Sequence, residues 1–257
     1  MILTIDIGNT NIKVGAWDHD HLAFVSRIVS NTHRTEDEYA IQLLDIMRLN
    51  ECNRAQFDGA IISSVVPALS STITNAVRQV VQTTRIFSVG PGIKTGLRIN
   101  IDNPAQLGAD MVCAAVSAAE KYPLPCIICS LGTATAIFAI GEDGSFLGGA
   151  VAPGMIISLE ALSSRTAQLP HINIDNPPES VINTNTIDCM KAGSIYGTAA
   201  MLDGMVERFR EKLGSEAGVI ACGGLARYVY EHCRQKMIYD DDLVMEGLKI
   251  IYFKNAK

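Results

Sequence analysis

Three short turns, each rich in glycine and small polar residues, carry the chemistry that this sequence offers. They read Asp6-Ile7-Gly8-Asn9-Thr10-Asn11, Gly132-Thr133-Ala134-Thr135 and Gly223-Gly224, and each follows an apolar segment. Glycine lets the backbone approach an anion closely, and backbone N–H groups with Thr or Asn side chains donate hydrogen bonds to its oxygens. A carboxylate such as Asp6 can hold a divalent cation nearby, partly through water in the case of Mg²⁺. The turns therefore predict a site for a nucleotide polyphosphate with a metal.

The first turn alone is weak support for this interpretation, because tight hairpins use Asn and Gly routinely. Its weight comes from the recurrence of the pattern in the second half of the chain, followed by the double glycine. The sequence contains neither a G-x-x-x-x-G-K-[ST] phosphate loop nor a G-x-G-x-x-G turn after a strand. The paired turns are therefore the predicted route to phosphate binding.

Asp110 is the candidate proton acceptor, because a hydroxyl that attacks a γ-phosphoryl group needs one, together with close alignment. Gly108 and Ala109 are small enough to let the loop approach a substrate. An alanine-rich helix expected at 109–121 directs its amino end at the same place, which favours phosphate. The helix dipole is also expected to lower the pKa of Asp110. From spacing alone, the favoured alternative for Asp110 is a simple helix N-cap.

The expected elements that position these residues follow a repeated order. In the first half we expect strands at 2–7, 12–17, 22–29, 59–66 and 86–89, with helices at 36–49 and 68–82. The second half has strands at 126–140 around the Gly132 turn, 145–153 and 218–222, with helices at 154–166, 187–212 and 226–235. A loop is expected at 100–108 and a closing helix at 240–254. The repeat predicts an α/β protein of two lobes, residues 1–117 and 118–257.

Composition narrows the class of protein. The 257 residues are 48% hydrophobic and 19% charged, which is enough apolar material for a full core. A net charge of −6 without a basic run argues against nucleic acid as the main partner, and no signal peptide or membrane span is predicted. The seven scattered cysteines suit reduced thiols, and the five histidines lack metal-ligand spacing. Cys126 and Cys129 have C-x-x-C spacing within an apolar run, which favours a buried strand over a redox or zinc site.

Along nearly its whole length the chain resembles the type III pantothenate kinases. That family lies within the superfamily of acetate and sugar kinases, heat-shock chaperones and actin. The matching stretches are DIGNTNIKVG (6–15), ISSVVP (62–67), DNPAQLGAD (102–110), LGTAT (131–135), FLGGAVAPGM (146–155), TAQLP (166–170), NTIDCMKAGSIYG (185–197), CGGLA (222–226) and DLVMEGL (242–248). The resemblance implies an actin-like ATPase fold, with two ribonuclease H-like lobes and a nucleotide cleft between them.

The resemblance also implies an activity. ATP would phosphorylate the primary alcohol of pantothenate to 4'-phosphopantothenate, on the route to coenzyme A. The implied cofactors are Mg²⁺ and a monovalent cation, K⁺ or NH₄⁺. The implied state is a cytoplasmic homodimer with pantothenate as its small-molecule partner. The one sequence feature in support of a dimer is the apolar segment 109–119.

Position by position, the resemblance assigns roles to residues of this chain. Asp6 would organise the Mg²⁺. Within Gly108-Ala109-Asp110-Met111, which would meet the substrate, Asp110 would be the base, and Thr186 would contact pantothenate. The residues that would bind ATP are Gly8, Asn9, Thr10, Asn11 and Lys13 in the first phosphate loop, Gly132 and Thr133 in the second, and Gly223 and Gly224 near the adenosine.

The chain departs from the family pattern on the side of the acceptor and the monovalent cation. Met111 stands where the family has an arginine that grips the substrate. Loss of a charge-assisted hydrogen bond, worth ~1.5–3 kcal/mol, would weaken pantothenate binding by roughly 10- to 150-fold. Ser130 stands where an aspartate of the family holds the monovalent cation. Phe138 replaces a second aspartate of that stretch, and Ile101 replaces a tyrosine.

These departures leave three hypotheses open. The leading one is a pantothenate kinase that uses substitute substrate contacts and needs no potassium. The others are a kinase for a different, less anionic alcohol, and a nucleotide-binding homologue without kinase activity that acts through a partner. Retention of Asp6, Asp110 and Thr186 favours the first hypothesis, because a pure binding module has no need of a carboxylate at position 110.

Overall fold

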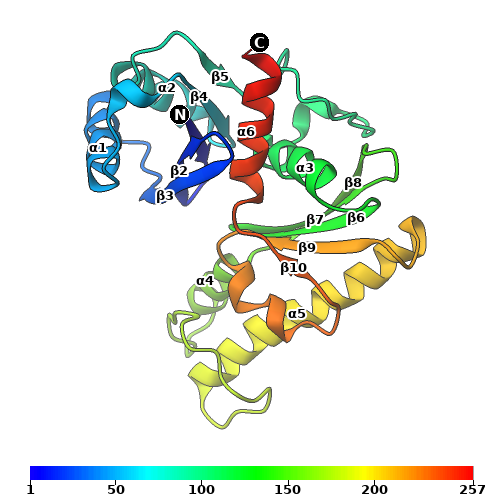
Figure 1. Cartoon of the computed structure of the whole chain (residues 1–257). Helices are drawn as coiled ribbons and strands as arrows, with labels where there is room; N and C mark the ends of the chain where they lie inside the picture. Colours follow the sequence, from blue (N-terminus) through cyan, green and yellow to red (C-terminus); the bar gives the residue numbers. More distant parts are fainter. Residues whose placement is uncertain (257) are drawn as a thin grey trace. The chain divides into compact units, whose positions relative to one another are not determined.

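The computed structural model describes residues 1–256, which fold into two compact units (Figure 1). Unit 1 comprises residues 1–97 and 102–117 together with the segment from Leu243 onward, and unit 2 comprises residues 98–101 and 118–242. Each unit is built on its own five-stranded sheet. The division predicted from sequence placed the last segment with the second half, whereas helix α6 (Leu243–Asn255) packs on strands of unit 1.

The sheet of unit 1 has the strand order β3-β2-β1-β4-β5, in which β1 pairs antiparallel with β2 and parallel with β4. Leu3, Ile5 and Ile7 on β1 join the core formed with helices α1 (Glu36–Leu49) and α2 (Pro67–Val80). Because side chains alternate along a strand, Thr4 and Asp6 face the opposite side, on which α6 packs. The strands are β1 (Ile2–Ile7), β2 (Asn11–Asp18), β3 (His21–Val29), β4 (Gly59–Ser64) and β5 (Ile86–Ser88).

Unit 2 repeats this topology. Its order, β10-β9-β6-β7-β8, is that of unit 1 when each strand is matched to its counterpart, and β6 again pairs antiparallel with one neighbour and parallel with the other. Helices α4 (Met155–Arg165) and α5 (Thr186–Leu213) contribute to its core. The strands are β6 (Cys126–Leu131), β7 (Ala134–Ile140), β8 (Phe146–Pro153), β9 (Gly218–Cys222) and β10 (Ile238–Tyr239). The predicted repeat of two α/β halves is therefore confirmed.

Helix α3 (Ala109–Lys121) begins in unit 1 and ends in unit 2. Its central residues, from Val112 to Ala118, are buried within the chain. Packing within the chain thus buries most of the apolar segment 109–119. This segment, which supported a dimer on sequence grounds, no longer supports one.

The helix predicted at 226–235 is wrong. Residues Ala226–Tyr228 and Tyr230–His232 form two separate 3₁₀ turns, η3 and η4, interrupted at Val229 (φ −120°, ψ −42°). Valine and tyrosine are weaker helix formers than alanine or leucine, and short 3₁₀ turns are a common substitute. Further 3₁₀ turns are η1 (Arg54–Gln56) and η2 (Pro104–Gln106), the latter inside the predicted loop at 100–108.

The closing helix starts later than its predicted first residue, 240. The backbone N–H of Asp240 donates to Ala221 O (2.9 Å), which extends the pairing of β10, and the Asp240 carboxylate accepts from Asp242 N (3.1 Å). These bonds hold the backbone out of the helix until Leu243. The two-residue strand β10 was not predicted, because so short a segment has no readable periodicity.

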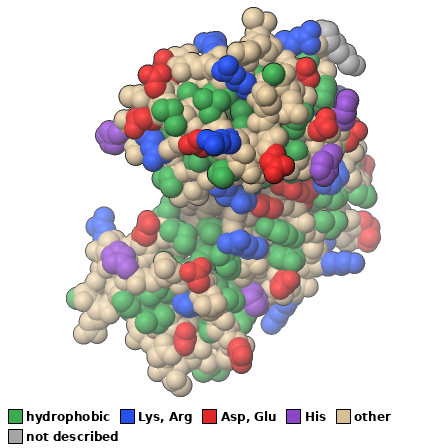
Figure 2. All heavy atoms as spheres, turned by 60° about the vertical axis from the view of Figure 1, so that its left-hand side comes forward, with side chains coloured by type: hydrophobic (Ala, Val, Ile, Leu, Met, Phe, Trp, Pro, Cys, Tyr) green, Lys and Arg blue, Asp and Glu red, His purple; other side chains and the backbone are tan. Residues whose placement is uncertain are grey.

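On the face drawn in Figure 2, Lys and Arg side chains alternate with Asp and Glu rather than forming one continuous basic patch. No helix within residues 1–256 has both the length and the apolar character needed to cross a bilayer. Cys126 and Cys129 are buried free thiols on β6, and the described residues contain no cluster of three or more potential metal ligands from His, Cys, Asp and Glu.

Candidate active site

Asp6 is the penultimate residue of β1, and strand register selects its neighbours. It pairs with Lys13 on antiparallel β2 and with Ser63 on parallel β4. Directly paired residues project from the same face of a sheet, so a cation and a hydroxyl flank the carboxylate. The sequence predicted a role for Lys13 only through the family resemblance, and it did not single out Ser63 within ISSVVP.

The positive charge and hydrogen bonds around Asp6 only partly offset the cost of ionising its carboxylate. Burial and the negative charge of Asp110 raise its pKa to about 6, against smaller lowering effects from Ser63 and Lys13. The Ser63 hydroxyl is near this carboxylate but falls short of hydrogen-bond geometry, so Asp6 Oδ1 and Ser63 Oγ are buried without a partner among residues 1–256. An orphaned buried carboxylate oxygen beside a second carboxylate fits a divalent cation, which would supply the missing positive charge.

Asp110 lies in the first turn of α3, one residue after the helix begins at Ala109, and is therefore not its N-cap. Its Oδ1 accepts a hydrogen bond from Met111 N (2.8 Å). A Cβ atom on Gly108 would lie 2.5 Å from the same oxygen, so glycine is needed there for this carboxylate position. The structure brings Asp110 near Asp6 within unit 1, although α3 follows β1 by most of that unit's sequence.

The expected lowering of the pKa of Asp110 by the helix dipole is wrong in its net direction. Burial raises the pKa of Asp110 and outweighs the backbone N–H groups that lower it. Desolvation penalises the charged form of a carboxyl group, and the amino end of a helix compensates only part of that penalty.

The first turn is a tight hairpin that is hydrogen-bonded to Ser30, the residue that follows β3. Gly8 N donates to Asn11 O (3.0 Å), while Ser30 Oγ donates to Gly8 O (2.6 Å) and Ser30 N to Thr10 O (3.0 Å). Asn9, Thr10 and Asn11 are exposed at its tip. The turn therefore presents small polar residues on a fixed backbone, adjacent along the strand to Asp6.

The second turn and the double glycine meet in unit 2. Gly132 N donates to Ala134 O (3.0 Å), and Leu225 N, just after the double glycine, donates to Leu131 O (3.1 Å). Gly223 has φ +92°, and a Cβ atom there would overlap the Leu131 carbonyl. The ends of parallel strands β6 and β9 thus bring Gly132, Thr133, Gly223 and Gly224 to one edge of the sheet.

Gly154 is a further component of this edge that sequence reasoning did not single out. Its N–H donates to Thr133 O (3.2 Å), and a Cβ atom on it would overlap the Gly132 and Thr133 carbonyls. Gly154 is also the N-cap of α4 and has no side chain with which to cap that helix. Its place in the FLGGAVAPGM stretch was the only available signal.

Ser130 is the topological counterpart of Asp6, since each is the penultimate residue of the central strand of its sheet. Its register neighbours are Ala136 on β7 and Cys222 on β9, in the places that Lys13 and Ser63 occupy in unit 1. The charged pair of unit 1 is therefore replaced by uncharged residues in unit 2. The carboxylate that a cation site would need is therefore present at the Asp6 position and missing at the Ser130 position.

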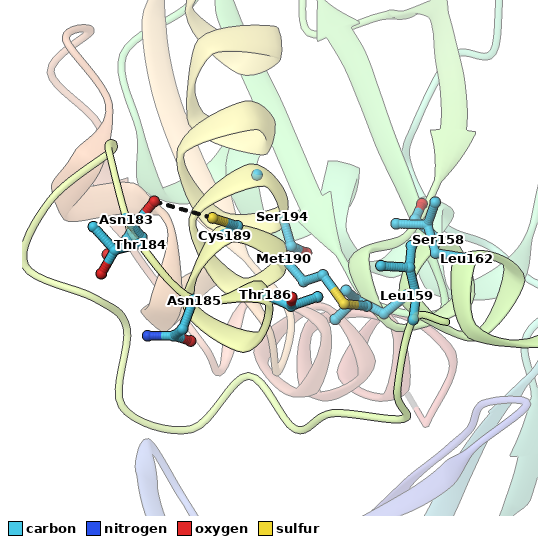
Figure 3. Close-up of a pocket in the computed structure, with 12 residues that line it drawn as sticks. Ser158, Leu159, Leu162, Asn183, Thr184, Asn185, Thr186, Cys189, Met190 and Ser194 are labelled. Carbon is cyan, nitrogen blue, oxygen red and sulfur yellow. Dashed lines mark hydrogen bonds between the residues drawn. The ribbon is translucent and has the colours of Figure 1, made fainter. Parts of the chain in front are cut away.

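Thr186, the first residue of α5, borders a cavity of about 550 Å³ in unit 2 (Figure 3). Leu159, Leu162, Leu169 and Met190 give it apolar walls, and Asn183, Asn185 and Ser194 add polar groups. Ser194 Oγ is buried and has no hydrogen-bond partner among the described residues. Among residues 1–256, no charged side chain lines this cavity.

Comparison with known proteins identifies the family. The family model of type III pantothenate kinases matches residues 2–208. A type III pantothenate kinase from Exiguobacterium sp. is 42% identical over 257 residues, covering 100% of both chains.

Solved structures share the fold at much lower identity. A Campylobacter jejuni protein described as a Baf family transcriptional activator has a TM-score of 0.63 and 16% identity, over 99% of this chain and 98% of that one. The activator of 2-hydroxyisocaproyl-CoA dehydratase from Clostridium difficile, solved with bound ADPNP, has a TM-score of 0.58 and 14% identity, over 99% and 95%. These two likenesses bear on the fold alone. The family match over most of the chain, with the full-length relative, shows that the protein belongs to the type III pantothenate kinase family.

Proposed function

We propose that this protein transfers the γ-phosphoryl group of ATP to the primary alcohol of pantothenate, a step of coenzyme A biosynthesis. The observation that carries the proposal is the convergence in unit 1 of Asp6, the Gly8–Asn11 turn and Asp110. Membership of a kinase family, with a full-length relative named for this reaction, supports it and implies use of ATP and a divalent metal.

Asp6 is the proposed metal carboxylate. Bound Mg²⁺ would neutralise phosphate charge on the nucleotide. Asp6 is a partly buried residue with a raised pKa, and its buried Oδ1 has no hydrogen-bond partner among the described residues, as expected of a ligand for a cation. Lys13, its register neighbour, adds positive charge beside the phosphate loop.

The two hairpin turns are the proposed phosphate loops. In unit 1 Gly8, Asn9, Thr10 and Asn11 would donate backbone and side-chain hydrogen bonds to the phosphates. In unit 2 Gly132 and Thr133 would do the same, with the Gly223-Gly224 turn at the adenosine side. The close backbone packing around Gly223 supports this role, because only glycine lets that turn lie against β6.

Asp110 is the proposed general base for the pantothenate hydroxyl. Burial raises the pKa of Asp110. An ionised carboxylate with a raised pKa accepts a proton more readily than an exposed carboxylate does. The hydrogen bond from Met111 N and the space above Gly108 fix the direction of the carboxylate. Asp110 can then accept the proton as the hydroxyl attacks phosphorus.

The cavity at Thr186 is the proposed place of the acceptor's aliphatic part. Pantothenate combines a branched dimethyl group with hydroxyl, amide and carboxylate groups. The leucines and Met190 suit the branched carbons, and Asn183, Thr186 and the unpartnered Ser194 hydroxyl suit the polar groups. With Met111 apolar and the cavity uncharged, hydrogen bonds from these neutral groups are the substitute for the family's arginine.

The proposed activity is independent of K⁺ and NH₄⁺, because Ser130 offers no carboxylate for a monovalent ion.

A homodimer is proposed from family membership and from exposed apolar side chains of β8 and α4, namely Leu147, Val151, Ile156, Ile157 and Leu162. Size-exclusion chromatography with light scattering would test the dimer.

The deciding assay measures ADP release by the purified protein with ATP, Mg²⁺ and pantothenate, with and without K⁺. Turnover that ignores K⁺ is expected. Turnover only with an uncharged analogue, such as the alcohol corresponding to pantothenate, would replace pantothenate by a less anionic acceptor. ATP binding in calorimetry without turnover of either alcohol would favour the non-catalytic, partner-dependent homologue.

A further inference from the structure

Helix α6 packs on the strands of unit 1 and touches α3, so it contacts both elements that carry the active-site carboxylates (Figure 1). Its first half contains most of DLVMEGL, a stretch of the family resemblance that lies outside the proposed phosphate loops and substrate contacts. The contacts of α6 therefore bear on the positions of Asp6 and Asp110.

The contact between α6 and α3 is made by backbone. A Cβ atom on Gly247 would overlap the carbonyl oxygen of Cys113 and lie 2.5 Å from its carbonyl carbon. Because the obstacle is backbone, no rotamer change can relieve it. Nearby, Ser117 Oγ donates to Glu246 Oε2 (3.3 Å), which fixes the two helices in register. Glycine at 247 thus sets the distance between α6 and α3.

The opposite side of α6 is fitted to the sheet by two other glycines. Gly15 on β2 leaves room for Met245, whose Cε lies 2.6 Å from the position of a Cβ on Gly15. Gly59, at the start of β4, leaves room for the Tyr252 ring. Met245 and Tyr252 are both buried. Helix α6 is therefore held on the sheet as closely as it is held on α3.

Cys113 joins this packing to the carboxylates. It follows Asp110 by one helical turn, and its thiol is buried. After burial, the charges of Asp6 and then Asp110 raise the pKa of this thiol, so both carboxylates lie near it. A displacement of α3 at Cys113 would therefore move Asp110 relative to Asp6.

We propose that Gly247 is a positioning residue for phosphoryl transfer: through the Cys113 backbone it holds α3 where Asp110 can act beside the metal carboxylate Asp6. This inference rests on the proposed function. The geometry of a transfer reaction is demanding, and a misplacement of ~1 Å can cost ~100-fold in rate. The role belongs to α6, which follows the whole of unit 2 in the sequence and returns to unit 1.

The first test compares Gly247→Ala with Gly197→Ala. Gly197 lies in α5 outside the lining of the Thr186 cavity, and a Cβ atom there would meet nothing within 4 Å. Mg-ATP calorimetry gives the number of binding-competent sites, so kcat can be expressed per site. We expect Gly247→Ala to lower kcat per site at least ~10-fold, with the Kd for Mg-ATP within ~2-fold of the parent, as misplacement of the base alone requires. Gly197→Ala should behave as the parent.

A second pair of variants covers the case in which Gly247→Ala does not fold. Gly15→Ala pushes on the flexible end of Met245, and adding Met245→Leu removes the Cε atom while nearly conserving volume. We expect Gly15→Ala to lower kcat per site and the double variant to restore it at least halfway. A merely destabilising effect would change the number of competent sites and leave kcat per site unchanged.

The outcomes separate the two proposals. If the parent protein shows no turnover, the proposed function fails. If the parent turns over and either folded Gly247→Ala or Gly15→Ala keeps kcat per site within ~2-fold, the positioning role of α6 is wrong while the function stands. Loss of kcat in Gly15→Ala without rescue by Met245→Leu would also overturn it.

Discussion

The carboxylate of Asp110, in the first turn of α3, lies close enough to Asp6, at the end of β1, to raise the pKa of Asp6. Both belong to unit 1, and the polar turn that follows β1 is adjacent to them. The proposed metal carboxylate and the proposed base therefore belong to one compact unit.

Asp110→Asn should abolish the base while keeping the shape of the side chain. General-base catalysis contributes ~10²- to 10⁴-fold, so we expect kcat to fall by ~100-fold or more while Mg-ATP still binds. Steady-state assays and calorimetry measure the two effects separately. Asp102→Asn is the matched control, because Asp102 is an exposed aspartate of the same stretch. A kcat for Asp110→Asn within a few-fold of the parent would assign Asp110 a structural role only.

Asp6→Asn should remove a pH dependence of stability from the metal-free protein. The folded pKa of Asp6 is about 6 and its ordinary value is 3.8, so between these values the folded state holds a proton that the unfolded chain has lost. The unfolding free energy therefore falls as pH rises through this window, by up to about 3 kcal/mol from this group. Asp6→Asn should lack that decline and lose Mg-ATP binding.

Urea unfolding in chelator at pH 4 and pH 7 measures the change in unfolding free energy for parent and variant. The difference between the two proteins reports the titration of Asp6 together with its coupling to Asp110, because the remaining titrating groups are the same. Identical changes in the two proteins would mean that folding does not raise the pKa of Asp6.

Gly223→Ala should damage the adenosine-side turn. Its φ of +92° disfavours any residue with a Cβ atom, at ~1–2 kcal/mol, and the new atom would also overlap the Leu131 carbonyl. We expect a lower thermal midpoint and weaker Mg-ATP binding. Gly224→Ala is the control for the thermal midpoint, since its Cβ would meet nothing within 4 Å and surface changes of this kind stay within ~0.5 kcal/mol. Equal effects of the two variants on the thermal midpoint would contradict this account of the turn.

Met111→Arg should strengthen binding of the anionic acceptor. A charge-assisted hydrogen bond of ~1.5–3 kcal/mol corresponds to a KM for pantothenate roughly 10- to 150-fold lower. The uncharged alcohol analogue should gain little, and the volume-conserving Met111→Leu should change neither KM. An unchanged KM for pantothenate in Met111→Arg would place the acceptor's carboxylate elsewhere.

Much of the fold could be read from local pattern. Apolar alternation marked β1, β2 and the paired strands of unit 2, and the repeated Gly/Thr turns revealed that the halves share one topology. The segment at 226–235 was misassigned because its apolar spacing fits a helix, whereas Val229 breaks the backbone there into two 3₁₀ turns. The motif at Asp6 predicted a phosphate-binding role from local pattern alone, since strand, carboxylate and glycine turn are contiguous in the chain.

The relationships between residues far apart in the sequence became visible only in the folded structure. Strand register placed Ser63 and Lys13 beside Asp6, and chain folding brought Asp110 to it. The net pKa shift of Asp110 depends on burial, which no local pattern reveals, and it reversed the direction expected from the helix dipole. The return of α6 to unit 1 was likewise invisible, because a helix's apolar face shows that it will pack but not against which sheet. Local chemistry is written in short segments, whereas desolvation and long-range packing exist only once the chain has folded.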